Sequence, residues 1–135
     1  MSAFSSISNS GSFSLAYLDA SNVIDNTIYI TYDTIDSTLI NGLQGISVTG
    51  YRDKTVQDRA IFYLFGGRDS TGVMSTSLFK VIVDLYSGGP KLVSESTVTT
   101  TNHPAGRMYT AMKTVGSFIY IYGGIDELGN VLSDI

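Results

Sequence analysis

Short runs of aromatic and β-branched residues alternate with turn residues along most of the chain. The clearest runs lie at residues 28–33, 60–67, 78–85 and 118–124, and each ends at or beside a Gly or an Asp. A helix would need apolar positions at spacings of three and four residues over ten or more positions, and no window of the sequence shows that pattern. The pattern therefore predicts an all-β protein with no helix longer than a turn or two.

Two of these runs belong to an internal repeat. Residues 62–72 and 119–129 align without gaps at an offset of 57 residues. A second pair of runs ends at Asp33 and Asp84, which are 51 residues apart. Repeated units of about 50 residues built from short strands indicate an array of small sheets, because one such sheet cannot cover its own apolar faces.

The repeat resembles the kelch repeat of β-propellers. Its signature is an aromatic and aliphatic strand that stops at a double glycine, here Gly66–Gly67 and Gly123–Gly124. Arg107 precedes the second of these strands at the place where the family carries an Arg. The resemblance implies structural glycines and four-stranded antiparallel blades, in a partial propeller that is incomplete at one or both ends.

The expected blades divide the chain as follows. Residues 1–25 form an N-terminal segment that contains a candidate degenerate strand at 13–18, and kelch-type repeats cover residues 26–135. The blade portions are residues 26–41, 43–97 and 107–135. The second blade has expected strands at 43–49, 60–67, 78–85 and 91–97 with a long charged loop at 51–59, and the third has expected strands at 108–114, 118–124 and 131–135.

The chain departs from the family pattern in composition and at one strand. It contains no Trp, so Leu39 and Leu92 take the place of the aromatic residue of the fourth strand. The second repeat has Leu43 and its neighbours where the family carries Arg. Two to two and a half blades cannot close a ring, since closed propellers have about four to eight blades.

Charge and composition narrow the classes of partner. The formal net charge is -4, which does not favour nucleic acid, because phosphate binding requires a basic surface. The absence of cysteine excludes disulfides and thiolate sites. No apolar run reaches the ~20 residues of a membrane span, and the first residues show no signal-peptide pattern. The cellular location is left open.

The residues that usually carry chemistry form no recognisable site. A strand and a turn surround each double glycine, whereas phosphate-binding glycine loops open a helix. His103 is the only histidine, so the usual three or four metal ligands are not available. Asp69 and the pair Asp126–Glu127 occupy repeated turn positions, where capping of the turn explains them. We expect no catalytic residue, no metal and no cofactor.

The sequence therefore predicts a noncatalytic protein-binding or scaffolding module of kelch-propeller type. The candidate partner-binding residues lie in connections between strands and are Tyr51, Arg52, Arg68 and Arg107, since Tyr and Arg commonly anchor interfaces. The partner is expected to be a protein, with a glycan, a homo-oligomer or the remainder of a longer chain as alternatives. Two other readings stay open: part of a kelch-fold carbohydrate-active enzyme (an oxidase or a sugar-acid isomerase), or a structural β protein completed by self-assembly.

Overall fold

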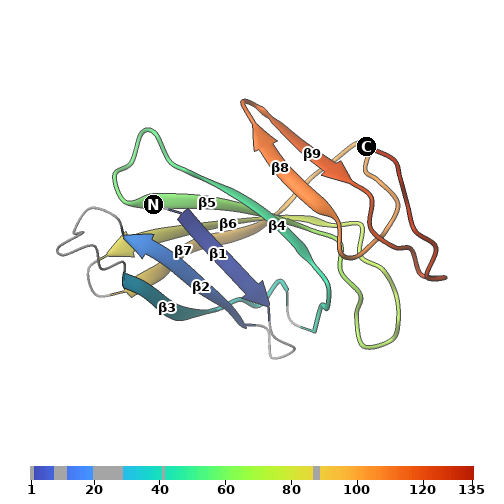
Figure 1. Cartoon of the computed structure of the whole chain (residues 1–135), viewed down its shortest axis with the longest axis horizontal. Coiled ribbons are helices and arrows are strands. Elements are labelled where there is room, and N and C mark those ends of the chain that lie inside the picture. The colour runs from blue at the N-terminus through green and yellow to red at the C-terminus, as the bar shows by residue number, and fades with distance from the viewer. Residues whose placement is uncertain (1, 8–11, 20–28, 41, 87–88) are drawn as a thin grey trace.

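The chain folds into three antiparallel sheets (Figure 1). A computed structural model describes residues 2–7, 12–19, 29–40, 42–86 and 89–135, and for residues 2–7, 12–19, 29–36, 86 and 89–90 the description is of the backbone alone. Its strands are β1 (Ser2–Ile7), β2 (Ser12–Asp19), β3 (Tyr29–Asp36), β4 (Ser47–Arg52), β5 (Arg59–Phe65), β6 (Leu78–Tyr86), β7 (Gly89–Val98), β8 (Ala111–Val115) and β9 (Phe118–Tyr122). No helix occurs among the described residues, and the all-β prediction is confirmed.

The first sheet has the strand order β1-β2-β3 and adjoins the second sheet through β3, which lies beside β7. Polar contacts fix this junction just beyond β3. Ser37 and Thr38 donate hydrogen bonds from their hydroxyl groups to the carboxylate of Glu95 on β7. Burial alone would raise the pKa of Glu95, but these hydrogen bonds outweigh it and the pKa is lowered. Glu95 thus holds the first two sheets together most firmly when it is ionised.

The second sheet is a complete four-stranded meander, β4-β5-β6-β7, and contains most of the described core. β5 has buried residues on both faces, as expected of a strand with a nearly continuous apolar sequence. Its Phe62 and Leu64 pack with Val81 and Val83 of β6 and with Ile40 from the connection to the first sheet. Each fully buried aliphatic or aromatic side chain contributes about 1.5–3 kcal/mol, so this cluster provides much of the stability.

β8 and β9 form a two-stranded hairpin that lies beside β4. A two-residue turn, Gly116 and Ser117, joins the strands and pairs Val115 with Phe118. The hairpin is attached to β4 by polar groups, because the amide of Thr114 donates to the hydroxyl of Thr49 at 3.0 Å and the amide of Thr110 donates to the hydroxyl of Ser47 at 2.9 Å.

The second sheet matches the sequence prediction in strand number and order, with shifted ends. β4 begins at Ser47 rather than at residue 43 and continues through Tyr51 and Arg52, which were expected in a loop. The reason is the register with β5, because Arg52 pairs with Ala60 and leaves only residues 53–58 for the turn. The charged connection is therefore shorter than the sequence indicated.

The predicted ends of the first and third repeats need larger corrections. Leu39 was expected in the fourth strand of the first blade. Residues 38–40 are a bend instead, and β3 itself is the last strand of the first sheet. Residues 131–135 form no strand either, and Val131 makes an isolated bridge with Ile125. Residues 13–18, expected as a candidate degenerate strand, lie within β2. Residues 26–28 of the first expected blade portion lie outside the described part, and residues 29–33 of the apolar run belong to β3.

The repeat seen in the sequence reappears in the backbone hydrogen bonds. After β5, the amide of Gly66 donates to the carbonyl of Ser77, and after β9 the amide of Gly123 donates to the carbonyl of Asp134. The turns that follow have the same bonds at the same offset. Their donor and acceptor pairs are Asp69 to Val73 and Asp126 to Asn130, Gly72 to Asp69 and Gly129 to Asp126, and Ser75 to Gly67 and Leu132 to Gly124. β5 and β9 are therefore structurally equivalent strands.

Candidate functional site

The segments that follow β3, β5, β7 and β9 meet at one end of the molecule, which we call the double-glycine end and define as residues 42–46, 66–77, 99–110 and 123–134. Backbone bonds join these segments to one another. The amide of Gly67 donates to the carbonyl of Arg107 at 2.9 Å, and the amide of Tyr109 donates to the carbonyl of Gly45 at 2.9 Å. The segments thus form one hydrogen-bonded surface and not a set of independent loops.

The double glycines allow the backbones to approach this closely. Gly66 has a φ of 77°, and a Cβ atom there would lie 2.2 Å from the carbonyl oxygen of Arg107. Gly124 has a φ of 94°, and its Cβ atom would lie 2.6 Å from the carbonyl oxygen of Met108. Both positions combine a conformation that disfavours L side chains with backbone contact, so glycine is required at each.

Arg107 is buried beneath this surface, with 3% of its area exposed. Its guanidinium donates to both carboxylate oxygens of Asp134, at 2.6 and 2.9 Å, and to the carbonyl of Gly123 at 3.1 Å. The hydrogen bonds with Asp134 raise the pKa of Arg107, and the same bonds lower the pKa of Asp134. These bonds occupy the guanidinium, so Arg107 positions the end of β9 and the segment after it.

The second sheet has no such ion pair at the equivalent place. Gln44 forms an isolated β-bridge with Arg68, and Met108 forms the equivalent bridge with Ile125. The residues that precede Gln44 and Met108, Leu43 and Arg107, are therefore counterparts. The hydrogen bonds of Gly66 and Gly123 make Ser77 the counterpart of Asp134. Both partners of the pair are therefore replaced together, so that no unpaired charge is buried in the second sheet.

Arg68 is the exposed arginine of the double-glycine end. Its backbone is held to Gln44, because the two residues exchange two hydrogen bonds of 2.8 Å. Its guanidinium lies over Gly72, where a Cβ atom would be 3.1 Å from the terminal nitrogen. A polar pocket of about 260 Å³ surrounds it, lined by Gln44, Arg68, Asp69, Ser70, Thr71 and Gly72.

Tyr51 and Arg52 lie at the opposite end of the second sheet, beside the turn between β4 and β5 (Figure 1). Tyr51 stacks on Tyr63 with 6.3 Å between ring centroids, and burial and the hydrogen bond with Tyr63 raise its pKa. Arg52 forms an exposed ion pair of 3.1 Å with Asp58. The structure therefore does not bring the four predicted partner-binding residues together but divides them between two ends.

The repeated acids act within their own turns. The carboxylate of Asp69 accepts hydrogen bonds from the hydroxyl of Thr71 and from the amides of Thr71 and Val73, which lower its pKa. Asp126 accepts the equivalent bonds from Leu128 and Asn130, and its pKa is lowered as well. Glu127 has another role, since its carboxylate accepts the amide of Met74 at 3.1 Å and ties the two turns together.

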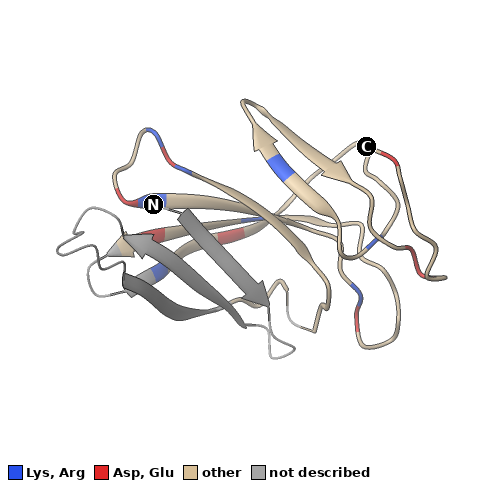
Figure 2. Ribbon diagram, in the orientation of Figure 1, with Lys and Arg blue, Asp and Glu red and all other residues tan. Residues whose placement is uncertain are grey.

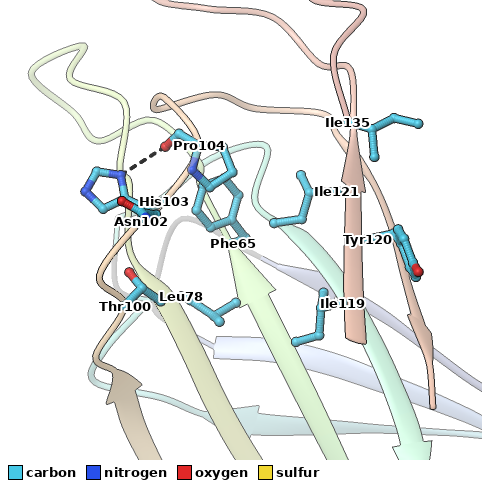
Figure 3. A pocket seen from close by; sticks show the side chains of 10 residues that line it. All are labelled: Phe65, Leu78, Thr100, Asn102, His103, Pro104, Ile119, Tyr120, Ile121 and Ile135. Atoms are coloured by element: carbon cyan, nitrogen blue, oxygen red, sulfur yellow. Dashed lines mark hydrogen bonds between the residues drawn. The ribbon is translucent and has the colours of Figure 1, made fainter. Parts of the chain in front are cut away.

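An apolar pocket of about 260 Å³ lies next to this end, between the second sheet and the hairpin (Figure 3). Phe65 and Leu78 form one wall and Ile119 and Ile121 the other, while the segment that carries His103 closes one side. Sequence reasoning did not identify this pocket. The repeat carries no signal for it, because Ile121 occupies the position of Leu64 and only the neighbours of the two strands differ.

Charged side chains are scattered over the described surface rather than gathered in a patch of one sign (Figure 2). Within the described part of the chain, no three His, Cys, Asp or Glu residues form a group able to hold a metal ion. No described helix is long and apolar enough to cross a membrane.

Comparison with known proteins gives no relative. No protein family, no curated protein and no solved structure matches the chain.

Proposed function

We propose that the chain is a noncatalytic protein-binding or scaffolding module of kelch-propeller type, and that its double-glycine end contacts the partner. The observation that carries the proposal is the exposed guanidinium of Arg68, which lies beside a polar pocket within the hydrogen-bonded double-glycine end. Connections held by rigid sheets are where binding residues are most often found.

The surroundings of Arg68 fit an interface anchor. The two hydrogen bonds to Gln44 fix its backbone, so only the side chain loses freedom on binding. A guanidinium offers five donors in a planar arrangement, which suits a carboxylate or a pair of carbonyl oxygens of another protein. The polar pocket beside it gives room for such a group.

The kelch-type arrangement is supported by the repeat. β5 and β9 have equivalent backbone bonds at an offset of 57 residues, and β4 and β8, the first strands of their sheets, lie side by side. Strand order and the contact between first strands agree with neighbouring blades of a propeller. The repeat does not indicate which protein is the partner.

The experiment uses the chain as bait in an extract of the cells that express it, followed by titration of the purified partner. Arg68→Ala is compared with Arg52→Ala, a matched arginine at the opposite end of the same sheet. We expect Arg68→Ala to weaken binding about 30-fold, the effect of losing about 2 kcal/mol at an anchor, and Arg52→Ala to leave it within about twofold. Equal affinities for both variants, or a larger loss with Arg52→Ala, would contradict the proposal.

A further inference from the structure

The geometry points to a carboxylate-binding site at the turn after β5: the polar pocket beside Arg68 binds one carboxylate group, which the guanidinium of Arg68 holds. This inference rests on the proposed function for the source of the carboxylate, which is the protein partner at the double-glycine end. It adds the chemistry of the group that the partner contributes.

Arg68 differs from the other arginines of the chain in having no acidic partner. Each of the other three forms an ion pair with an aspartate, and the pairs are Arg52–Asp58, Arg59–Asp84 and Arg107–Asp134. No ion pair within the described part of the chain involves Arg68. A guanidinium and a carboxylate match in shape and charge, because two parallel hydrogen bonds can join them. Arg68 therefore has the capacity that the other arginines already use.

The neighbouring acid, Asp69, is directed into its own turn and does not neutralise Arg68. One of its carboxylate oxygens accepts hydrogen bonds from the hydroxyl and the amide of Thr71, at 2.7 and 2.8 Å, and from the amide of Val73 at 3.0 Å. Asp69 thus caps the turn, and the guanidinium beside it is left for a group from another molecule.

The backbone of the turn holds the guanidinium in place. Gly72 has a φ of 95°, and a Cβ atom there would lie 3.1 Å from the terminal nitrogen Nη2 of Arg68, 3.6 Å from its Nε and 3.8 Å from its Cζ. The guanidinium therefore covers the backbone of Gly72. This contact limits the positions of the side chain before binding, so less entropy is lost when a ligand binds.

The equivalent turn after β9 shows that this turn can form without an arginine. Ile125 occupies the position of Arg68 in the repeat and makes the equivalent isolated β-bridges on both sides. Gly129, the counterpart of Gly72, has no atom within 4 Å of the position of a Cβ atom. The two turns share their backbone bonds, and only the first has a positive charge over its glycine. The charge of Arg68 is thus not needed to build the turn.

The other residues of the pocket favour an acceptor with a single negative charge. The hydroxyl of Ser70 and the side-chain amide of Gln44 line the pocket with Arg68, and both groups can donate hydrogen bonds. Asp69 lines it as well, and the chain has a formal net charge of -4. These negative charges repel a dianion such as phosphate more strongly than a carboxylate. The occupant is therefore a carboxylate.

An NMR titration of the isotope-labelled chain with small carboxylates tests the inference. N-acetylglutamate α-methylamide presents a side-chain carboxylate, and N-acetylalanine presents the carboxylate of a chain end, so the two probes distinguish the two sources within a protein. N-acetylglutamine α-methylamide is the neutral control of the same shape. Inorganic phosphate at about pH 8 supplies a dianion. The signal followed is the Nε–H group of Arg68.

We expect at least one of the two carboxylates to bind with a Kd on the order of 10 mM and to shift the Nε–H signal of Arg68 more than that of any other arginine. The neutral amide should bind at least about tenfold more weakly to the unmodified chain, because the charge-assisted hydrogen bonds are lost.

Two variants locate the site. Arg68→Ile copies the residue of the equivalent turn and should weaken binding of the carboxylate at least about tenfold. Arg52→Gln removes an exposed, paired arginine at the opposite end of the sheet and should leave the affinity within about twofold. Unchanged amide signals of Leu64 and Val81 in the core show that each variant is folded. The comparison with the neutral amide uses the unmodified chain and does not depend on any variant.

Three results would overturn the inference: equal binding of the carboxylate and the neutral amide, carboxylate binding that Arg68→Ile leaves unchanged, or tighter binding of phosphate than of either carboxylate. The proposed function fails or stands separately. If neither carboxylate binds while Arg68→Ala still weakens binding of the purified partner, the inference fails and the proposed function stands. If a carboxylate binds at Arg68 while Arg68→Ala leaves the affinity for the partner unchanged, the pocket is a carboxylate site and the proposed function fails.

Discussion

β5 and β9 are equivalent strands in one repeat, yet one is buried and the other is largely exposed. Phe65 at the end of β5 is 1% exposed, whereas Tyr122 at the equivalent position of β9 is 50% exposed. Phe118 is 68% exposed, and its counterpart Ile61 is 8% exposed. The two strands have similar sequences and the same backbone bonds at their ends, so their own residues do not explain the difference.

The neighbouring strands explain the difference in exposure between β5 and β9. β5 has a strand on each edge and packs with the core of the second sheet on one face, while Phe65 faces the hairpin pocket on the other. Among the described residues β9 has a strand on one edge, and its residues Phe118, Tyr120 and Tyr122 are exposed, although Tyr120 also lines the pocket. The apolar sequence of a repeat strand therefore shows which side chains could be buried, and the neighbouring strands determine which of them are buried.

The largest expected effect contrasts the cores of the two strands. Leu64→Ala should lower the free energy of unfolding by about 2–5 kcal/mol, because Leu64 is fully buried and leaves a cavity. Ile121→Ala should cost about 1–2 kcal/mol, since the half-buried side chain already borders a pocket. Urea unfolding of both variants measures the difference. Equal losses would show that β9 is as well packed as β5.

The next effect concerns the approach of backbones at the end of β5. Gly66→Ala places a Cβ atom against the carbonyl of Arg107 at a positive φ, and we expect a loss of at least about 2 kcal/mol. Gly116→Ala in the turn of the hairpin is the control, with a positive φ but no atom within 4 Å of the added group. It should cost about 1 kcal/mol. Thermal unfolding measures the stability of both variants. Similar losses of stability would mean that the backbone of Arg107 moves away from the added Cβ atom at no cost in free energy.

A smaller effect on stability is expected when the ion pair of Arg107 and Asp134 is replaced by the residues at the equivalent positions of the second sheet. Arg107→Leu with Asp134→Ser copies Leu43 and Ser77. The double variant should be less destabilised than the sum of the two single variants, because Asp134→Ser alone leaves a buried guanidinium without its carboxylate. A double-mutant cycle in urea measures this coupling. Additive losses would show that the ion pair does not act as a unit.

The ion pair between Arg107 and Asp134 also makes the stability of the chain depend on pH. The pKa of Asp134 is lowered from its ordinary value of 3.8 in the folded state, so its stabilisation is complete above that value and is lost as the pH falls through the lower, folded pKa. The difference in stability between the wild type and Asp134→Ser should therefore shrink below about pH 4. A difference that stays constant from pH 7 to pH 3 would contradict the role of the charge.

The smallest effect should come from the exposed turn acids. Asp69→Ala and Asp126→Ala remove equivalent carboxylates that each accept two backbone amides. Both variants should lose a small and similar amount of stability, less than Gly66→Ala, because water can replace the lost bonds. Chemical denaturation checks this. A large loss at only one of the two turns would show that the turns are not equivalent.

The sequence was sufficient for the parts of the fold that depend on local pattern. The strands of the second sheet follow from alternating and continuous apolar runs, and the turns after Gly66–Gly67 and Gly123–Gly124 follow from repeated Gly and Asp. The ends of β4 could not be foreseen, because they depend on the register with β5 and not on propensity. Residues 131–135 have a strand-like sequence, but the backbone there returns along Gly123 and Gly124 instead.

The candidate site was harder to foresee for a physical reason. Arg52, Arg68 and Arg107 are the same residue type, and the sequence predicted all three in connections between strands, although Arg52 belongs to β4. One pairs with Asp58, one is exposed beside a polar pocket, and one is buried against Asp134. These differences come from contacts between segments distant in sequence. Pattern alone identified the arginines but not which of them face a partner.

Hydrogen exchange of the free chain, followed residue by residue by NMR, tests the account most directly. The amides of Leu64 and Ile121 are equivalent in the repeat. Among the described residues, the first lies in a strand paired on both edges, while the second lies in a strand paired with β8 alone. We expect Leu64 to exchange only through global unfolding and Ile121 to exchange faster by at least about a hundredfold. Equal protection at the two amides would contradict the open edge of β9 and the comparison built on it.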